Sequence, residues 1–506
     1  MSGISFNTIP GNGLVGPIFA FEVNSGGQFT ESSRLVLFGH KTAAGIATAN
    51  VPYPISSQGD ADTYFGGGSM LREMFRIARQ NAPVQDIWAV AVPDTGTAPV
   101  TTVTLANIAN STAPCVIEIQ GEQISVTATA SDTPSTIAAD LAALINAYYN
   151  PLTNAMLPVT ASASAGVVTL TGRHASAIMG EIDIYFPSLK GTNLLAQSGV
   201  ATVAVTTAAS GAPSLAAAFA ALGSDPADFV VSPWTDSASL ATGTTWANDT
   251  SGRWSWFSQT YGHVWTCNSG NYAAQTTLGL GLNDRHETVI GRITGGANGQ
   301  AHPSWLWAAG ICGAVCSWLS DFTTGNVSRN QTGIIVQGLK PPRDRTVWPQ
   351  YAARNSLLQS GISTWTVDAA HNVCIDKIVT TYRTGASGQP DSVFRDIQSV
   401  YQAQWSLQYI RAQIAQDCGQ KAFAQTNPGS LCSIVTPADI KASFIHAVTQ
   451  LEKNGVLTNS SATAQLIQVQ QDTTNPDRVN VFLPLERVSP LDVLATNATF
   501  YSLLAA

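Results

Sequence analysis

Charged residues are scarce in this sequence. Asp, Glu, Lys and Arg make up only 11% of its 506 residues, whereas an average soluble domain has about 25%. The balance is acidic, with a net charge of −8, and the sequence shows no basic face that would neutralise the phosphates of a nucleic acid. The composition therefore argues against nucleic acid as the main partner. A weakly charged surface repels its own kind little, which suits a protein that packs densely against neighbouring molecules.

Long apolar runs are also lacking. Residues 1–10 have no basic segment followed by an apolar core, so we do not expect a cleaved secretion signal. The longest apolar stretch, residues 305–319, is shorter than the roughly 20 residues that span a bilayer. It predicts a buried helix and no membrane insertion.

The cysteines do not form a recognisable framework. There are seven of them, an odd number scattered through a large chain, which predicts free thiols in a cytoplasm. Cys312 and Cys316 share a helix face, but no other pair supplies the remaining ligands at the spacing of a metal site. We therefore predict that both are buried structural residues.

Motifs for catalysis or cofactor binding are not apparent. The glycine-rich residues 65–69 precede a predicted helix, a place that can bind phosphate, but the spacings of a P-loop and of a dinucleotide-binding loop are missing, and residues 38–42 lack the upstream glycine of a P-loop. There is no G-x-S-x-G motif, and His286-Glu287 is not followed by a second histidine at the zinc-hydrolase spacing. We predict no catalytic residue, no cofactor and no metal site.

The densest basic run is residues 340–345, Lys-Pro-Pro-Arg-Asp-Arg. Its prolines and the intervening Asp predict a solvated loop. As a partner for this run, an acidic protein surface is more plausible than DNA.

The chain is too long for one hydrophobic core and should divide into several domains. A strand at 34–38, a helix at 69–78 with Ser69 as its cap and a strand at 87–92 predict a crossover unit in a largely parallel sheet. From 97 to 211 the composition shifts to Thr, Ala, Ser and Val, with only eight charged residues, six of them acidic. Strands at 115–119, 124–128 and 167–171 and a helix at 136–149 predict a β-rich insertion in this region.

The alternation of strands and helices resumes after the insertion. The later elements predicted from periodicity are helix 214–222, strand 229–233, helix 244–261, strand 263–266, buried helix 305–319, a helix ending at 358, strand 373–382 and a long amphipathic helix over 393–414. We therefore predict an α/β and α+β multidomain fold, with an interrupted α/β body, an inserted β-rich, sandwich-like domain, an α+β carboxyl-terminal domain and extended strand arms at both ends. The predicted boundaries are 1–27 for the amino-terminal arm, 28–96 and 212–349 for the two parts of the α/β body, 97–211 for the inserted outer domain, 350–474 for the carboxyl-terminal α+β domain and 475–506 for the carboxyl-terminal strand arm.

Both ends of the chain read as strands with no partner nearby in sequence. The first contains Ile18, Phe19, Phe21 and Val23, and it is flanked by the glycines Gly11, Gly13, Gly16, Gly26 and Gly27. The second contains Val479, Val481, Leu483 and Leu485 on one face at a period of two. Strands on flexible connections suggest a protein that joins to copies of itself, because a strand edge is a template for another chain. The alternative is that each strand completes a sheet of its own domain.

Four segments together resemble the tail sheath proteins of contractile-tailed phages, particularly the Mu-like subgroup. They are residues 4–10 (Ile-Ser-Phe-Asn-Thr-Ile-Pro), residues 65–71 (Phe-Gly-Gly-Gly-Ser-Met-Leu), residues 355–362 (Asn-Ser-Leu-Leu-Gln-Ser-Gly-Ile) and residues 475–479 (Asn-Pro-Asp-Arg-Val) with the following Pro484-Leu485 and Ser489-Pro490-Leu491. Each motif alone is weak, but the resemblance extends over the whole chain. The low charge of residues 97–211 is a departure from the family pattern.

The resemblance implies a non-enzymatic building block of a virion tail, assembled in the bacterial cytoplasm. Sheath subunits stack as hexameric rings in a six-start helix around a tail tube, and the sheath shortens when the baseplate triggers it. The partners implied are other copies of the chain, the tail tube protein, and the baseplate and tail terminator proteins. In such assemblies the terminal arms add strands to sheets of neighbouring subunits, which gives the flanking glycines the role of hinges. The ejection of the genome follows from contraction and needs no hydrolysis.

A second function class stays open from the residues alone. An α/β protein with an inserted β-domain can also be a cytoplasmic enzyme, with its site at strand ends near residues 66–69. Microscopy of the purified chain separates the two hypotheses, since only the first predicts rings or tubes.

Overall fold

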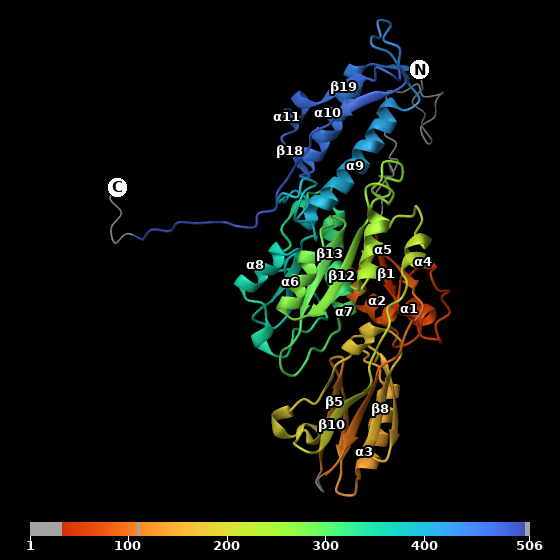
Figure 1. The fold of residues 1–506 in the computed structure, drawn as a ribbon, viewed down its shortest axis with the longest axis vertical. Helices are drawn as coiled ribbons and strands as arrows, with labels where there is room; N and C mark the ends of the chain where they lie inside the picture. The colour runs from red at the N-terminus through yellow and green to blue at the C-terminus, as the bar shows by residue number, and fades with distance from the viewer. Residues whose placement is uncertain (1–32, 109–111, 501–506) are drawn as a thin grey trace, which may run out of the picture. The chain divides into compact units, whose positions relative to one another are not determined.

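A computed structural model describes residues 33–108 and 112–500, all within one compact unit (Figure 1). This part of the chain is a mixed α/β protein with eleven α-helices and several separate sheets. The predicted mixed fold class is confirmed at this level. The predicted arm residues Ile18, Phe19, Phe21 and Val23, and the hinge residues Gly11, Gly13, Gly16, Gly26 and Gly27, lie outside the described residues.

The largest element is an eight-stranded sheet. Its strand order is β15 (Val373–Lys377), β14 (Ile362–Val367), β13 (Glu287–Ile293), β12 (His263–Gly270), β11 (Phe229–Val231), β1 (Arg34–Gly39), β3 (Asp86–Ala91) and β2 (Pro52–Pro54). The six strands from β14 to β3 are parallel, and only the outermost β15 and β2 run antiparallel to their neighbours. The sheet is therefore largely parallel, as the crossover pattern predicts.

Strands from both sides of the insertion meet in this sheet. In β1, Leu35 pairs with Ile87 of β3 on one side and with Phe229 of β11 on the other. Strand β1 is apolar and buried after its first residue, which is typical of a parallel strand covered on both faces. The sheet also includes β14 and β15, which lie beyond the boundary predicted at residue 349. The predicted domain boundaries remain a prediction.

Helices α2 (Met70–Asn81) and α7 (Ser304–Ser320) pack against each other in the body core. The Ser69 hydroxyl accepts a hydrogen bond from the Arg72 amide at 3.2 Å, so the predicted cap of α2 is confirmed. Helix α7 is buried over almost its whole length, as its apolar composition predicts. Three shorter helices of this part of the chain are α1 (Gln58–Phe65), α4 (Ala216–Ala221) and α6 (Tyr272–Gly281).

The described residues between 97 and 211 form two antiparallel sheets and one α-helix around a hydrophobic core of their own. One sheet has the order β10 (Ala201–Thr207), β4 (Val100–Leu105), β8 (Val167–Gly172) and β7 (Val159–Ser164), and the other has the order β6 (Glu122–Ala128), β5 (Ala113–Ile119) and β9 (Ile184–Tyr185). Helix α3 (Pro134–Ala147) begins at the cap Thr133 and packs on both sheets. At the base, Thr97 and Ser210 exchange two backbone hydrogen bonds of 3.1 and 3.2 Å, so the two connections of the insertion lie side by side.

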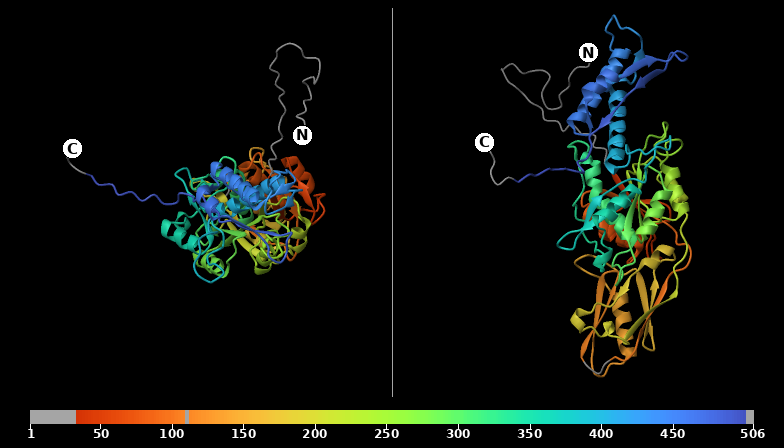
Figure 2. Two further views of the ribbon diagram at one scale, coloured as in Figure 1. Left: turned by 90° about the horizontal axis from the view of Figure 1, so that it is seen from above. Right: turned by 60° about the vertical axis from the view of Figure 1, so that its left-hand side comes forward.

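The carboxyl-terminal part combines long helices with short ribbons. Helix α8 (Tyr351–Gln359) ends within one residue of the predicted end at 358, and Gly361 follows with a φ of +80°, which favours glycine. Helix α9 (Ile397–Cys418) lies beside α10 (Pro437–Lys453), which is followed by α11 (Ser460–Leu466) (Figure 2). Three two-stranded ribbons accompany them: β16 (Ala422–Phe423) with β17 (Ile434–Val435), β18 (Leu457–Thr458) with β21 (Glu486–Arg487), and β19 (Gln468–Gln471) with β20 (Val479–Phe482).

The helix predicted over 244–261 is wrong. Helix α5 (Ser237–Ala247) starts earlier, because Asp236 caps it by accepting from the Ser239 amide at 3.1 Å. It ends where the Asn248 side chain accepts from the amides of residues 250, 251 and 252, which turns the backbone away from the helix. The strand predicted over 373–382 is also shorter, since β15 ends at Lys377.

The basic run 340–345 is not simply a solvated loop. Lys340 Nζ donates to the carbonyl of Gly121 at 2.6 Å, and Arg343 Nη1 donates to Asp183 Oδ2 at 2.7 Å. Arg343 also pairs with Glu118 and lies over the ring of Tyr185, 4.2 Å from its centroid. The acidic surface that contacts this basic run is therefore the inserted region of the same chain.

Candidate assembly site

The predicted carboxyl-terminal strand exists and pairs within its own chain. In β20, Val481 lies opposite Val469 and Asn480 opposite Gln470 of the antiparallel β19. Among the described residues no strand pairs with the other edge of β20. A two-stranded ribbon is marginal alone in water, and its open edge presents free backbone donors and acceptors. Strand β20 thus pairs with β19 of its own chain and leaves its other edge open to a further strand.

The predicted one-sided pattern of this strand is visible in the burial. Val479, Val481 and Leu483 are half-buried, whereas Leu485 is 37% exposed. Phe482, which points to the opposite face, is 60% exposed. Both faces of the segment therefore carry apolar side chains that are only partly covered in the single chain.

After β20 the chain is tied to α9 and α10. Strand β21 pairs with β18, which follows α10. The side chain of Gln402, buried on α9, donates to the carbonyl of Val488 at 2.8 Å, and the Val488 amide donates to Val456 at 3.2 Å. The segment is held in place as far as residue 488.

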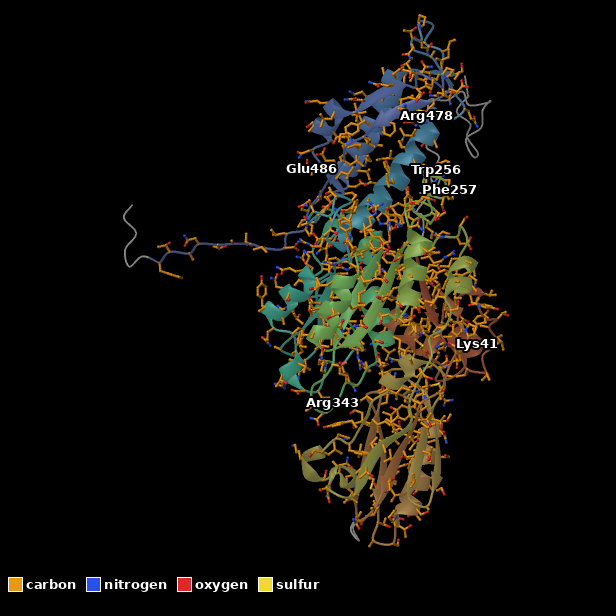
Figure 3. The ribbon with its side chains drawn as sticks, viewed as in Figure 1. Lys41, Trp256, Phe257, Arg343, Arg478 and Glu486 are labelled. Carbon is orange, nitrogen blue, oxygen red and sulfur yellow. The ribbon has the colours of Figure 1, made fainter. Side chains whose placement is uncertain are left out.

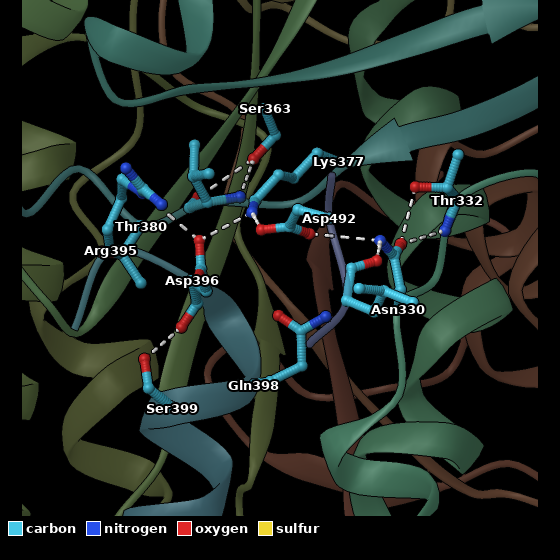
Figure 4. A network of polar contacts seen from close by, with 12 residues as sticks. Asn330, Thr332, Ser363, Lys377, Thr380, Arg395, Asp396, Gln398, Ser399 and Asp492 are labelled. Atoms are coloured by element: carbon cyan, nitrogen blue, oxygen red, sulfur yellow. Dashed lines mark hydrogen bonds and ion pairs between the residues drawn. The ribbon is translucent and has the colours of Figure 1, made fainter. Parts of the chain in front are cut away.

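A polar cluster holds the chain once more at Asp492 (Figure 4). Lys377, the last residue of β15, forms an ion pair with Asp492 and a second with Asp396, whose Oδ1 is 3.0 Å from Lys377 Nζ. Asn330 Nδ2 donates to the carbonyl of Leu491 at 2.9 Å and to Asp492 Oδ1 at 3.1 Å. We call Asn330, Lys377, Asp396 and Asp492 the arm anchor.

Asp396 is the buried centre of the arm anchor. It is only 3% exposed, and besides Lys377 it faces Arg395 at 3.3 Å and Arg487 at 3.9 Å. It also stands at the cap position of α9, where the helix dipole favours a negative charge. A buried carboxylate with three cationic neighbours is well compensated, so the anchor fixes the point at which the chain leaves the body.

Beyond the anchor the chain runs on without secondary structure, away from the other elements (Figures 1 and 2). Its apolar side chains are exposed: Val493 by 76%, Leu494 by 79% and Phe500 by 96%. Such side chains gain burial only against another surface. We call residues 493–500 the exposed arm.

Periodicity in the sequence indicates β20 but not the anchor. Asn330, Lys377, Asp396 and Asp492 lie far apart along the chain, and none belongs to a motif. The start of the exposed arm carries a weak signal, since Val493 and the preceding Leu491 are apolar residues on either side of Asp492. This signal is too short to predict a strand by itself.

The glycine-rich residues 65–69 do not offer a phosphate site. At the amino end of α2, the Met70 amide donates to His174 Nε2 at 3.0 Å, and the Leu71 amide donates to the His40 carbonyl at 3.1 Å. The next two amides bond to Ser69. All four amides that a phosphate would need are therefore used by the protein.

Residues 33–108 and 112–500 contain neither a metal-binding cluster nor a helix that could span a membrane. In these ranges no group of three or more His, Cys, Asp or Glu side chains could hold a metal ion. None of their helices is long and apolar enough to cross a membrane.

A known protein matches nearly the whole length of this chain. A Mu-like prophage FluMu tail sheath protein of Haemophilus influenzae is 27% identical over 495 residues, which cover 94% of this chain and 95% of that protein. This chain resembles the Mu-like tail sheath proteins. The resemblance seen in the sequence motifs is thus confirmed, while no protein-family model matches the chain.

Solved structures also match over most of the chain. A sheath tail protein from Desulfitobacterium hafniense matches with a TM-score of 0.49 and 13% identity, over 94% of this chain and 97% of that chain. A chain of the anti-feeding prophage baseplate matches with a TM-score of 0.46 and 10% identity, over 96% of this chain and 99% of that chain.

Proposed function

We propose that this chain is a structural subunit of a contractile phage tail sheath. It polymerises as stacked hexameric rings around a tail tube, and contraction of the polymer drives the tube through the host envelope. The observation that carries this proposal is the match to a Mu-like prophage tail sheath protein over 94% of the chain. Because the match covers almost the full length of both chains, it concerns the whole molecule and not one shared module.

The carboxyl-terminal elements support this function physically. The open edge of β20 can accept a strand, and the exposed arm can supply one, so copies of the chain can join by backbone hydrogen bonds. In this proposal Val479, Val481, Leu483 and Leu485 belong to the inter-subunit sheet. The amino-terminal Ile18, Phe19, Phe21 and Val23 add a second arm with glycine hinges.

In this role the protein lies in the tail sheath of a virion, after assembly in the bacterial cytoplasm. Its partners are other copies of the chain, the tail tube protein, and the baseplate and tail terminator proteins. Residues 350–480 face the tube and residues 97–211 project outward. No catalytic step is part of this function.

Truncation tests the proposal. The full-length chain should form rings or tubes in negative-stain micrographs. A chain that ends at Asp492 keeps β20, β21 and the arm anchor, so it should stay folded and lose polymerisation. Removal of residues 1–27 should act in the same way. Tubes of normal appearance from both truncated proteins would rule out assembly through the arms.

A substitution series provides the matched control. Replacing Val493, Leu494 and Phe500 by Ser removes only the exposed apolar side chains of the arm. Replacing Val84 and Leu152 by Ser removes apolar side chains that are equally exposed, at 90% and 92%, elsewhere on the chain. The first variant should fail to polymerise and the second should polymerise normally.

A further inference from the structure

Two adjacent aromatic residues stand exposed on the loop after α5 (Figure 3). Trp256 is 80% exposed and Phe257 is 60% exposed, and their rings meet edge to face with centroids 5.6 Å apart. Large exposed aromatic side chains on a soluble protein mark interaction surfaces, and Trp is the residue most enriched at the energetic centres of protein interfaces. We call Trp256 and Phe257 the aromatic knob.

The loop beneath the knob is firmly braced. The buried Arg253 donates to the carbonyls of Gly223 and Asp225, each at 2.8 Å, and to Thr260 at 3.1 Å. Trp254 Nε1 donates to the carbonyl of Gly262 at 2.8 Å. Because the loop is already ordered, presenting the two rings to a partner costs little conformational entropy.

The same chain carries an apolar groove between α4 and α5, with a volume of about 420 Å³. Phe219 and Trp246 line it and are themselves in contact, with ring centroids 5.1 Å apart. The other lining residues are small, namely Ala216, Ala220, Ala241, Thr242 and Thr245. Among the described residues no charged side chain lines the groove, so it suits an aromatic occupant that brings no charge.

We propose that the aromatic knob of one copy of this chain inserts into the α4–α5 groove of another copy. The inference rests on the proposed function, in which the chain is a homopolymer, and it adds a side-chain contact to the strand exchange of the arms. Knob and groove are different surfaces, so their pairing is heterologous and leaves a free knob and a free groove at each end. A contact of this kind propagates into a ring or a helix.

The aromatic knob is too small to hold two copies together by itself, but it can add to other contacts within a polymer. Two aromatic side chains bury on the order of 300–500 Å² at most, whereas a stable pair of proteins needs about 800 Å² on each partner. The knob alone therefore leaves the chain monomeric at low concentration. Together with other contacts between the same subunits it stabilises the polymer.

The test uses the full-length chain and compares three variants. W256S/F257S removes the knob, and A241W fills the groove from an exposed helix position. Each should raise the protein concentration needed for polymerisation at least tenfold while leaving the circular dichroism spectrum of the monomer unchanged. V84S/L152S, which removes two other exposed apolar side chains, should polymerise like the wild type. Equal polymerisation of the wild type and W256S/F257S would overturn the proposal.

Photocrosslinking identifies the occupant directly. Phe257 is replaced by p-benzoylphenylalanine in a ¹⁵N-labelled chain, which is mixed with unlabelled chain, polymerised and irradiated. The expected product joins the labelled residue 257 to an unlabelled peptide within residues 216–246. A crosslink to any other part of the chain would overturn the knob-in-groove contact and leave the sheath function standing. A wild-type chain that never polymerises would instead overturn the proposed function, and the knob contact with it.

Discussion

Arg343 and Asp183 face each other across the junction between the body and the inserted region, with Arg343 Nη1 2.7 Å from Asp183 Oδ2. Glu118 meets the same guanidinium, and the side chains of all three residues are less than a fifth exposed. Burial raises the pKa of Asp183 although Arg343 opposes this effect. Asp183 and Glu118 thus share Arg343 as their ion-pair partner.

The variant R343M should be strongly destabilised, because it leaves Asp183 and Glu118 without their cation. Removing one member of a buried ion pair costs about 3 kcal/mol of the free energy of unfolding. Urea denaturation followed by circular dichroism measures this difference. The control R345M removes an exposed arginine of the same basic run and should stay within about 0.5 kcal/mol of the wild type. Equal effects of both variants would contradict the role assigned to Arg343.

The variant D492A should release the exposed arm without unfolding the protein. It removes the contacts of Asp492 with Lys377 and Asn330, while Asp396 keeps its own cations. Because Asp492 is partly exposed, the free energy of unfolding should fall by less than about 1 kcal/mol. Thermolysin should cut residues 489–500 several-fold faster than in the wild type.

The control for this experiment is D477A. Asp477 is exposed and lies outside the arm anchor. Cleavage of D477A should match the wild type, and high salt should accelerate cleavage of the wild type toward the rate of D492A. Identical cleavage rates of D492A and the wild type would show that the anchor does not hold the arm.

Because of Glu287, we expect the free energy of unfolding to fall as the pH rises. Glu287 is 2% exposed, and among the described residues neither carboxyl oxygen has a hydrogen-bond partner. Burial raises its pKa from 4.5 to about 8, and Asp284 adds to the effect. Between these two values the unfolded chain gives up the proton while the folded protein retains it. The contribution of Glu287 to the free energy of unfolding is therefore fully present below pH 4.5 and is lost as the pH rises toward 8.

The variant E287M should be more stable than the wild type, and its advantage should be about 3 kcal/mol larger at pH 8 than at pH 5. Urea denaturation at both pH values measures this difference. The control D140N changes an exposed carboxyl. Its free energy of unfolding should differ from that of the wild type by the same amount at both pH values. An advantage of E287M that does not change with pH would mean that Glu287 is not held neutral.

The seven cysteines should divide into three classes of reactivity. All seven are free in the structure, as their odd number predicts; five are buried, Cys418 is half-buried and Cys432 is exposed. Burial raises the pKa of Cys115 to about 11, which lowers the thiolate fraction as well as access. A thiol reagent should label Cys432 quickly, Cys418 slowly and the other five only after unfolding.

Denaturation without reductant should reveal seven thiols, and C432S should lose only the fast phase. Disulfide-linked peptides in a non-reduced digest, or fewer than five thiols, would contradict the prediction of a reduced chain.

The local features of the fold were predictable because their causes lie within a few residues of one another. Ser69 caps α2, Thr133 and Pro134 start α3, and the apolar run of α7 becomes a buried helix. The helix after residue 236 was misplaced because two local signals compete. Asn248 stops the helix by capping the following turn, while the aromatic residues up to Tyr261 only imitate helical spacing.

The sequence by itself determined the α/β alternation, the insertion, the strand at 479–482 and the resemblance to tail sheath proteins, because these depend on periodicity, composition and short motifs. Only the tertiary structure decided that Arg343 docks on Asp183, that Lys377 holds Asp492, and that Trp256 stays outside while Trp254 is buried. The ion pairs join residues more than a hundred positions apart. Which distant partners meet depends on how the sheets and helices pack, and no local pattern encodes that packing.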